Sequence, residues 1–176
     1  MMQGRARAML VAGWLLIGCG AKEFRLVKAP EMPFNAFGQL EVRELRNEVK
    51  LPKELDADDQ KDFEAFVASF PNRLREEFAK RGVFRVAEGK KLVVESTLIE
   101  FDPGSGSARY WVGMGAGEGK IRVDVTFKDP AGKVVAQGQA VGGVSGGWGG
   151  GSLNDAMERL VDSIADFVRD NYETVR

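Results

Sequence analysis

The chain has 176 residues, of which 44% are hydrophobic, so one hydrophobic core and one folded domain are expected. Its 25 basic and 26 acidic side chains nearly cancel, which excludes a strong overall field that would attract nucleic acid or acidic substrates. The absence of histidine removes the commonest general base and transition-metal ligand, and a single cysteine excludes an intramolecular disulfide and a cysteine-rich metal site.

The first eighteen residues have the layout of an export signal. Arg5 and Arg7 lie in a positive stretch without acids, and a mainly apolar run from Leu10 to Ile17 follows. This run is much shorter than the about 20 helical residues that cross a bilayer. We therefore predict a cleaved lipoprotein signal peptide over residues 1–18 rather than a transmembrane helix.

The end of this run, Leu16-Ile17-Gly18-Cys19, resembles the bacterial lipobox. The resemblance implies diacylglycerol on the Cys19 sulfur and an acylated amino group, and two or three acyl chains anchor a protein stably. Gly20 stands where an aspartate favours retention in the inner membrane of enterobacteria, so we expect the outer membrane. An ordinary signal peptide ending near a cysteine, and an uncleaved core segment, stay open as alternatives.

Residues 19–36 are predicted to be a lipidated tether, because Pro30 and Pro33 interrupt them and no hydrophobic period is sustained. A single periplasm-facing α+β domain is expected over residues 37–176. Once residues 1–18 are removed, 23 basic and 26 acidic side chains remain, so the mature chain is mildly acidic.

A strand and a long helix are predicted in the first part of this domain. Leu40, Val42 and Leu45 alternate imperfectly within residues 37–49, which indicates a strand carrying a bulge. Helical spacing then relates a series of apolar residues: Phe63, Phe66, Val67, Phe70, Leu74 and Phe78. The helix should end with Gly82 as its C′ residue and bend over residues 69–72, because Pro71 lies inside it.

Four strands are predicted between the two helices. Residues 83–86 and 91–101 should form a hairpin around Glu88-Gly89. Over residues 121–128 apolar and polar side chains alternate without a break, which predicts one packed face and one face in water. Turn residues 129–132 lead into a partner strand over 133–141, and this hairpin is expected at the centre of the sheet.

A second helix is predicted after Ser152, because apolar residues recur at helical spacing from Leu153 to Tyr172. Four charged residues should point away from the core: Asp162, Asp166, Arg169 and Asp170. The order strand, helix, four strands, helix favours an α+β two-layer sandwich. We expect a mostly antiparallel sheet of four to five strands with both helices on one face.

Fifteen of the 22 glycines lie between Gly104 and Gly151, in two clusters beside the central hairpin. Neither cluster fits a P-loop, and the first is followed by a strand where a dinucleotide motif needs a helix. The second precedes a helix and could hold an anion, although a flexible linker is the simpler interpretation. Four side chains in these clusters are the predicted contact residues: Tyr110, Trp111, Met114 and Trp148. Closing the ends of the core is the alternative role for the aromatic ones.

No catalytic constellation is evident in the sequence. Acidic pairs such as Asp58-Asp59 and Glu76-Glu77 fall on predicted helix caps or faces, where solvated charge is the ordinary state, and their spacing pairs none with a nucleophile. We therefore predict a protein that is not an enzyme and that uses no cofactor or metal.

The stretch from Pro103 to the C-terminus carries a family resemblance. It contains Gly-Ser-Gly-Ser-Ala-Arg-Tyr-Trp-Val-Gly-Met-Gly-Ala-Gly, an alternating strand, an Asp-Pro-Ala-Gly-Lys turn, a Gly-rich loop and a helix. This order resembles the bacterial lipoprotein family catalogued as domain of unknown function 4410. The resemblance implies export and this architecture, and it carries no catalytic residues because the family has no established activity.

Two functions of different classes are the main candidates, and glycoside hydrolysis by two carboxyl groups about 5–10 Å apart stays open as a third. The first is a membrane-anchored binding or scaffolding module whose Gly-rich, aromatic loops contact another envelope protein or a second copy of the chain. The alternative is a ligand-binding lipoprotein that holds a lipid, glycan or peptidoglycan fragment between sheet and helices. Phe63, Phe66 and Phe70 would line such a pocket, unless they are core residues.

Overall fold

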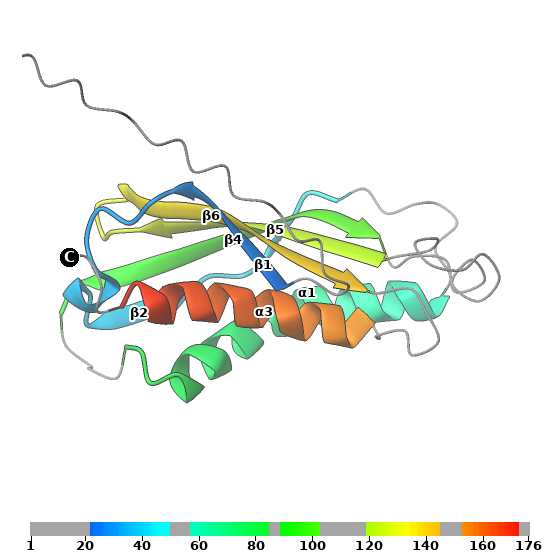
Figure 1. The fold of residues 1–176 in the computed structure, drawn as a ribbon. Coiled ribbons are helices and arrows are strands. Elements are labelled where there is room, and N and C mark those ends of the chain that lie inside the picture. The colour runs from blue at the N-terminus through cyan, green and yellow to red at the C-terminus, as the bar shows by residue number, and fades with distance from the viewer. Residues whose placement is uncertain (1–21, 50–56, 85–88, 103–118, 145–152, 173–176) are drawn as a thin grey trace, which may run out of the picture.

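The computed structural model describes residues 22–49, 57–84, 89–102, 119–144 and 153–172. In these ranges two long helices lie on one face of a single sheet (Figure 1). No helix among them is both long and apolar enough to cross a bilayer. The elements in chain order are β1 (Lys22–Lys28), the 3-10 helix η1 (Phe34–Ala36), β2 (Gln39–Val42), β3 (Arg46–Asn47), α1 (Ala57–Lys80), β4 (Lys91–Asp102), β5 (Gly119–Lys128), β6 (Val134–Val144) and α3 (Leu153–Asp170).

The sheet follows the order β1-β6-β5-β4-β2, and β3 pairs with β4 next to β2. The pairs β1–β6, β6–β5 and β5–β4 are antiparallel, whereas β2 and β3 run parallel to β4. β2 and β3 can run parallel to β4 because the segment that contains α1 connects them and returns the chain to the same end of the sheet. The predicted α+β class, with a mostly antiparallel sheet and both helices on one face, is confirmed, and six strands are close to the predicted number.

The β5–β6 hairpin lies at the centre of the sheet, as predicted. Along β5, Val123, Val125 and Phe127 are fully buried under the helices, and the residues between them are half-buried on the opposite face. In the turn, the Asp129 carboxylate accepts two backbone N–H groups, both at 2.9 Å. Gly132 has a φ of 83°, a left-handed conformation that favours glycine. Turn chemistry therefore holds the register of the central strands.

α1 ends as the sequence predicts. The N–H of Val83 donates to the carbonyl of Phe78 at 3.2 Å, and the N–H of Gly82 donates to the carbonyl of Ala79 at 3.0 Å. This pair of bonds, with φ of 71° at Gly82, is a Schellman cap. The predicted apolar stripe is buried: Phe63, Phe66, Phe70, Leu74 and Phe78. The helix continues through Pro71, and the bend stays a prediction.

The first predicted strand after α1 is wrong. Val83 belongs to the helix cap, and Phe84 has a φ of 55°, a conformation that strands do not contain. The Phe84 N–H donates to the Tyr172 hydroxyl at 3.1 Å, and the two rings pack edge to face at 5.2 Å. Phe84 thus packs against the end of α3, and residues 85–88 lie outside the described ranges.

α3 lies directly on β6 because glycine leaves room for it. A Cβ atom added to Gly142 would lie 2.3 Å from the carbonyl oxygen of Ala156 in the first turns of α3. The predicted stripe of α3 is buried against the sheet and α1: Met157, Leu160, Val161, Ile164 and Val168. The close approach of helix and strand therefore depends on the absence of a side chain at residue 142.

The predicted tether over residues 19–36 is wrong from residue 22 onward, because β1 is a strand of the sheet and η1 is also folded. The Phe24 ring stacks on Phe167 of α3 with 4.3 Å between ring centroids. As an edge strand, β1 has a solvent side where Leu26 and Val27 are exposed, so its hydrophobic alternation is weak. The described fold therefore begins at Lys22 rather than at residue 37.

Candidate functional site

The site residues predicted from the sequence lie outside the described residues: Cys19, Tyr110, Trp111, Met114 and Trp148. The structure nevertheless shows where their segments join the fold. Residues 103–118 connect the end of β4 to the start of β5, and residues 145–152 connect the end of β6 to α3. Cys19 comes three positions before the first residue of β1.

These joints meet at one end of the domain. The strand register aligns Gly119, the first residue of β5, with Val144, the last residue of β6. Asp102, the last residue of β4, aligns with the second residue of β5, and Lys22 aligns with β6 two residues from its end. We call this the loop end, defined by Lys22, Asp102, Gly119 and Val144; it lies opposite the β5–β6 turn (Figure 1).

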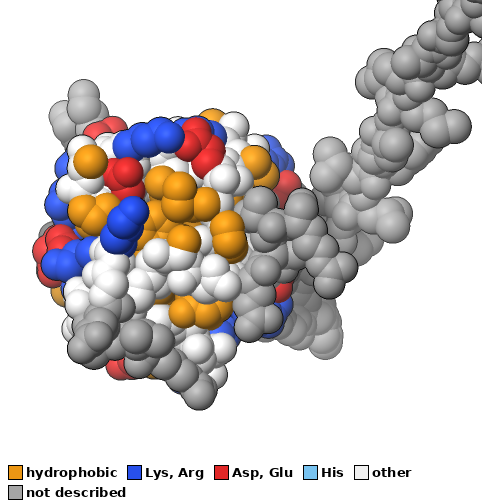
Figure 2. Space-filling model, turned by 90° about the vertical axis from the view of Figure 1, so that its left-hand side faces the viewer, with side chains coloured by type: hydrophobic (Ala, Val, Ile, Leu, Met, Phe, Trp, Pro, Cys, Tyr) orange, Lys and Arg blue, Asp and Glu red, His pale blue; other side chains and the backbone are white. Residues whose placement is uncertain are grey.

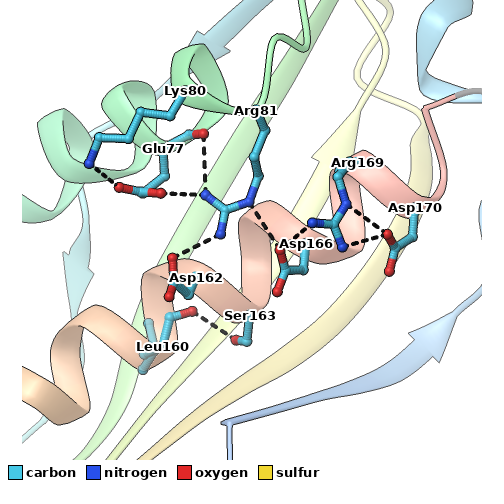
Figure 3. A network of polar contacts seen from close by, with 9 residues as sticks. All are labelled: Glu77, Lys80, Arg81, Leu160, Asp162, Ser163, Asp166, Arg169 and Asp170. Carbon is cyan, nitrogen blue, oxygen red and sulfur yellow. Dashed lines mark hydrogen bonds and ion pairs between the residues drawn. The ribbon is translucent and has the colours of Figure 1, made fainter.

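Arg81 bridges the two helices on the outer side of the helix layer (Figure 3). It follows the last residue of α1, and its Nη2 atom lies 2.8 Å from Asp162 of α3. Its Nε atom lies 3.0 Å from Asp166, one turn further along α3, and its Nη1 atom pairs with Glu77 in α1. One side chain that is 14% exposed therefore links α1 to two successive turns of α3.

Electrostatics keep this bridge charged. Burial lowers the pKa of Arg81, but hydrogen bonds to Asp162, Glu77 and Asp166 outweigh it and raise the pKa above its ordinary value. The hydrogen bond from Lys80 is the main cause that lowers the pKa of Glu77, and Arg81 adds to it. The arrangement stabilises the packing of two helices, and each charged group is already balanced by a partner.

A polar groove of about 630 Å³ lies between α1 and α3 beside this bridge. Arg73 spans it by donating from Nη1 to the Asn154 side chain at 3.1 Å. The acids on its walls, Glu76, Glu158 and others, outnumber the cations Arg73 and Lys80. Such a lining suits a polar or cationic group more than an apolar ligand.

The face of the sheet opposite the helices carries paired charges. Glu95 on β4 is 13% exposed, with Arg43 and Lys128 each at 2.6 Å. The hydrogen bond from Lys128 is the main cause that lowers the pKa of Glu95. Further along β4, Glu100 pairs with Arg122 at 2.8 Å. This face is therefore polar, as the alternation in β5 predicts.

The exposed large hydrophobic residues of the described ranges gather at β1 and the segment after it. Leu26 is 51% exposed, Val27 68% and Met32 39%. We call these three residues the edge strip. Figure 2 looks at the domain from the end opposite the loop end, where hydrophobic side chains form a patch bordered by basic and acidic ones. Exposed apolar residues gathered in one place mark a contact surface more often than scattered ones do.

Glu31 ties the segment after β1 to the β5–β6 turn. Its carboxylate lies 2.6 Å from Nζ of Lys133 and 3.0 Å from Nζ of Lys28. Hydrogen bonds from Lys133 and then Lys28 lower the pKa of Glu31 to about 2. Glu31 therefore stays ionised to strongly acidic pH, and its ion pairs join the segment after β1 to the β5–β6 turn.

The phenylalanines considered for a ligand pocket are core residues. Phe63 packs edge to face on Phe101 with 4.7 Å between ring centroids, and Phe66 packs on Phe70 at 5.5 Å. In the part of the chain that the structure describes, no group of three or more acidic or cysteine side chains could hold a metal ion.

Sequence reasoning missed both the Arg81 bridge and the edge strip. Asp162 and Asp166 are predicted to face away from the core, yet both meet a partner that lies 81 and 85 residues earlier in the chain. No pattern within α3 alone identifies such a partner. For the edge strip, the signal was present: Leu26 and Val27 are adjacent, with a cation on each side.

The profile of a family described as domain of unknown function (DUF4410) matches residues 38–146. No curated protein sequence matches the chain. Among solved structures, the PelC dodecamer from Paraburkholderia phytofirmans has a TM-score of 0.54 at 13% identity, over 84% of this chain and 96% of that chain. A point variant of the PelC dodecamer gives 0.54 at 14% identity, over 86% and 98%.

A third solved structure, from Caulobacter crescentus and described as a candidate lipoprotein, is less similar. Its TM-score is 0.41 at 12% identity, over 78% of this chain and 89% of that chain. At such identities the likeness to PelC establishes a shared fold. The third structure carries no inference about function.

Proposed function

The chain belongs to the family of domain of unknown function DUF4410, and on that premise we propose that it is a lipid-anchored lipoprotein of the bacterial cell envelope. In this proposal it acts as a binding or scaffolding module, contacting further copies of itself or another envelope protein. The module is not an enzyme. Gly20, directly after the anchored cysteine, makes the outer membrane the proposed location.

The observation that carries the proposal is the short distance along the chain between the lipobox and the fold. Cys19 precedes the first residue of β1 by three positions. Three extended residues span at most about 11 Å. Lipid on Cys19 would therefore hold the loop end of the domain close to the bilayer surface, instead of letting the domain move on a long tether.

Tyr110, Trp111, Met114 and Trp148 remain the proposed contact residues. The two segments that carry them join the domain at the loop end, beside the strand that follows Cys19. Contacts made through these segments would therefore form next to the membrane. Aromatic side chains in Gly-rich surroundings supply large contact areas, which suits recognition of a neighbouring protein.

Assembly of several copies is the second part of the proposal. The two solved structures that share this fold are described as dodecamers. The sequences are only 13% and 14% identical, so the number of chains in an assembly of this protein has to be measured. The edge strip supports self-association independently, since it leaves apolar side chains in water that a neighbour could cover.

No observation in the described residues favours the ligand-binding alternative. The phenylalanines that would line a pocket are at most 5% exposed and pack on other rings: Phe63, Phe66 and Phe70. The groove between the helices is polar and carries no enclosed apolar wall. A lipid or glycan held between sheet and helices would need to displace the core.

Labelling cells with a clickable fatty acid tests the anchor. We expect label on the wild-type chain and its recovery with the membrane fraction, and we expect neither for Cys19→Ser. Trp148→Ala is a matched variant that leaves the lipobox intact and should be labelled like wild type. Equal labelling of wild type and Cys19→Ser, or a wild-type chain in the soluble fraction, would contradict the proposal.

A further inference from the structure

Both outer strands of the sheet lack a strand neighbour on one side, among the residues that the structure describes. β1 ends the sheet on one side, and β2, with β3 beside it along β4, ends it on the other. An outer strand edge presents N–H and C=O groups that can pair with a strand of another chain. On the β2 edge, Arg75 of α1 already donates to the Val42 carbonyl at 2.6 Å, so a partner strand would replace this bond. On β1, two residues of the edge strip lie at this border: Leu26 and Val27.

The two free edges run in compatible directions. β1 is antiparallel to β6, β6 to β5 and β5 to β4, whereas β2 is parallel to β4. β1 and β2 therefore run in opposite directions across the sheet. A second copy placed beside the first in the same orientation brings its β2 next to β1 as an antiparallel pair, the more stable arrangement per residue.

The polar faces of the two edges also correspond. Arg25 follows Phe24, whose ring packs on α3, so Arg25 lies on the face without helices. Glu41 precedes the buried Val42 and pairs with Lys91, so it lies on the same face. When the sheets of two copies are continuous, these two charged side chains come to one surface.

The charges of the two edges are complementary. β1 carries three cations and one acid: Lys22, Arg25, Lys28 and Glu23. The segment 39–48, which contains β2 and β3, carries three acids and two cations: Glu41, Glu44, Glu48, Arg43 and Arg46. Opposite charges on neighbouring strands stabilise pairing, whereas two β1 strands facing each other would repel.

We propose that β1 of one copy pairs with the β2–β3 edge of the next copy, so that the sheet continues from chain to chain and the edge strip is covered. The inference rests on the self-association proposed above and names its surfaces. Each copy offers one edge of each kind, so the contact is head to tail and repeats until a ring closes. A contact between two β1 strands would instead stop at a dimer.

Paired cysteines test this contact in the full chain extracted in detergent. Arg25→Cys and Glu41→Cys replace side chains that are 61% and 38% exposed, so the fold should tolerate both. A disulfide forms when the two Cα atoms lie roughly 4.4–6.8 Å apart. The double variant should give an oxidation-dependent ladder that extends beyond the dimer. Arg25→Cys combined with Arg43→Cys tests the alternative in which the two strands are shifted by two residues relative to each other.

Two controls make the ladder specific. Wild type contains only Cys19 and should give no ladder in the same oxidant. Arg25→Cys combined with Ala65→Cys places the second thiol on the exposed side of α1 and should give none either. A strong dimer from Arg25→Cys alone would mean that two β1 strands meet, and it would overturn the head-to-tail contact.

Charge placed on the edge strip is the second test. Val27→Asp should weaken assembly by about tenfold in the dissociation concentration, because an exposed valine would no longer be buried on contact. Ala65→Asp, at the exposed position on α1, should leave assembly unchanged. Circular dichroism melts of both variants should match wild type, since both positions face solvent. Unchanged assembly of a folded Val27→Asp chain would contradict the inference.

The outcomes separate this inference from the proposed function. Oligomers without a cross-link in either register would overturn the edge contact and leave self-association standing. A monomer at all concentrations in native mass spectrometry would overturn both. If Cys19→Ser protein floats with vesicles of anionic phospholipid and Val27→Asp abolishes this, the edge strip contacts the bilayer, and the edge contact is wrong. Fatty-acid labelling tests the lipid anchor independently of the cross-linking, native mass spectrometry and vesicle experiments.

Discussion

Replacing Gly142 by alanine tests how closely α3 packs on β6. The new Cβ would lie 2.3 Å from the carbonyl oxygen of Ala156 and 3.2 Å from the Cβ of Leu160, so α3 must move away from the sheet. Forcing one methyl group into a packed interior costs about 2 kcal/mol. For a domain of this size, the expected fall in melting temperature is about 4–8 °C.

Gly143 provides the matched control for this substitution. It is the next residue of β6, a methyl group placed on its Cα would meet no other part of the fold within 4 Å, and like Gly142 it has no left-handed backbone. Gly143→Ala should therefore melt at the wild-type temperature or slightly above, because alanine loses less backbone entropy than glycine. The measurement is the melting temperature of purified full-length wild type, Gly142→Ala and Gly143→Ala in the same detergent. Equal melting temperatures for the two alanine variants would refute the packing described for α3.

Three further predictions concern the helix bridge, the first strand and a charge pair. Arg81→Met should destabilise the domain by about 1–2 kcal/mol in thermal melts at low salt, whereas Arg169→Met, at a 52% exposed side chain, should change it by less than about 0.5 kcal/mol; equal effects would contradict the bridge. Gly138→Ala should loosen β1, because its Cβ would lie 2.3 Å from the Phe24 ring, and faster amide hydrogen exchange confined to β1 and β6 is expected, with unchanged exchange as the contrary result. The lowered pKa of Glu31, about 2 against 4.5, means that its stabilising pairing is present above pH 4.5 and is lost as the pH falls toward 2. In Lys133→Met the Glu31 carboxyl signal in NMR should titrate at higher pH than in wild type; no shift would contradict the pairing.

The elements predicted most reliably are those whose signals lie within a short stretch of sequence. The alternation over β5, the turn at Asp129 and the stripe of α1 each follow from residues a few positions apart, and all three are confirmed. Gly82 also ends α1 as predicted, because a C′ glycine needs only the local backbone. Elements whose conformation depends only on neighbouring residues were therefore predicted correctly.

The errors arise where distant contacts determine the structure. β1 is a strand because β6 pairs with it and Phe24 stacks on Phe167, and neither contact leaves a period in residues 22–28. Val83 and Phe84 have the composition of a strand but are taken up by the helix cap and by Tyr172. For the candidate site, the sequence predicted contact residues in two segments outside the described residues. Leu26 and Val27 gave a local signal for the edge strip, but only the strand order shows that they lie on an outer strand of the sheet.

The most direct test of the account is native mass spectrometry of the full-length protein after extraction from membranes in detergent. One measurement gives the mass of the chain and the number of chains in the particle. We predict a chain that begins at Cys19 with its lipid attached, in particles of several copies. Particles of a single chain, or a chain that retains Met1 and carries an unmodified cysteine, would contradict the central claim.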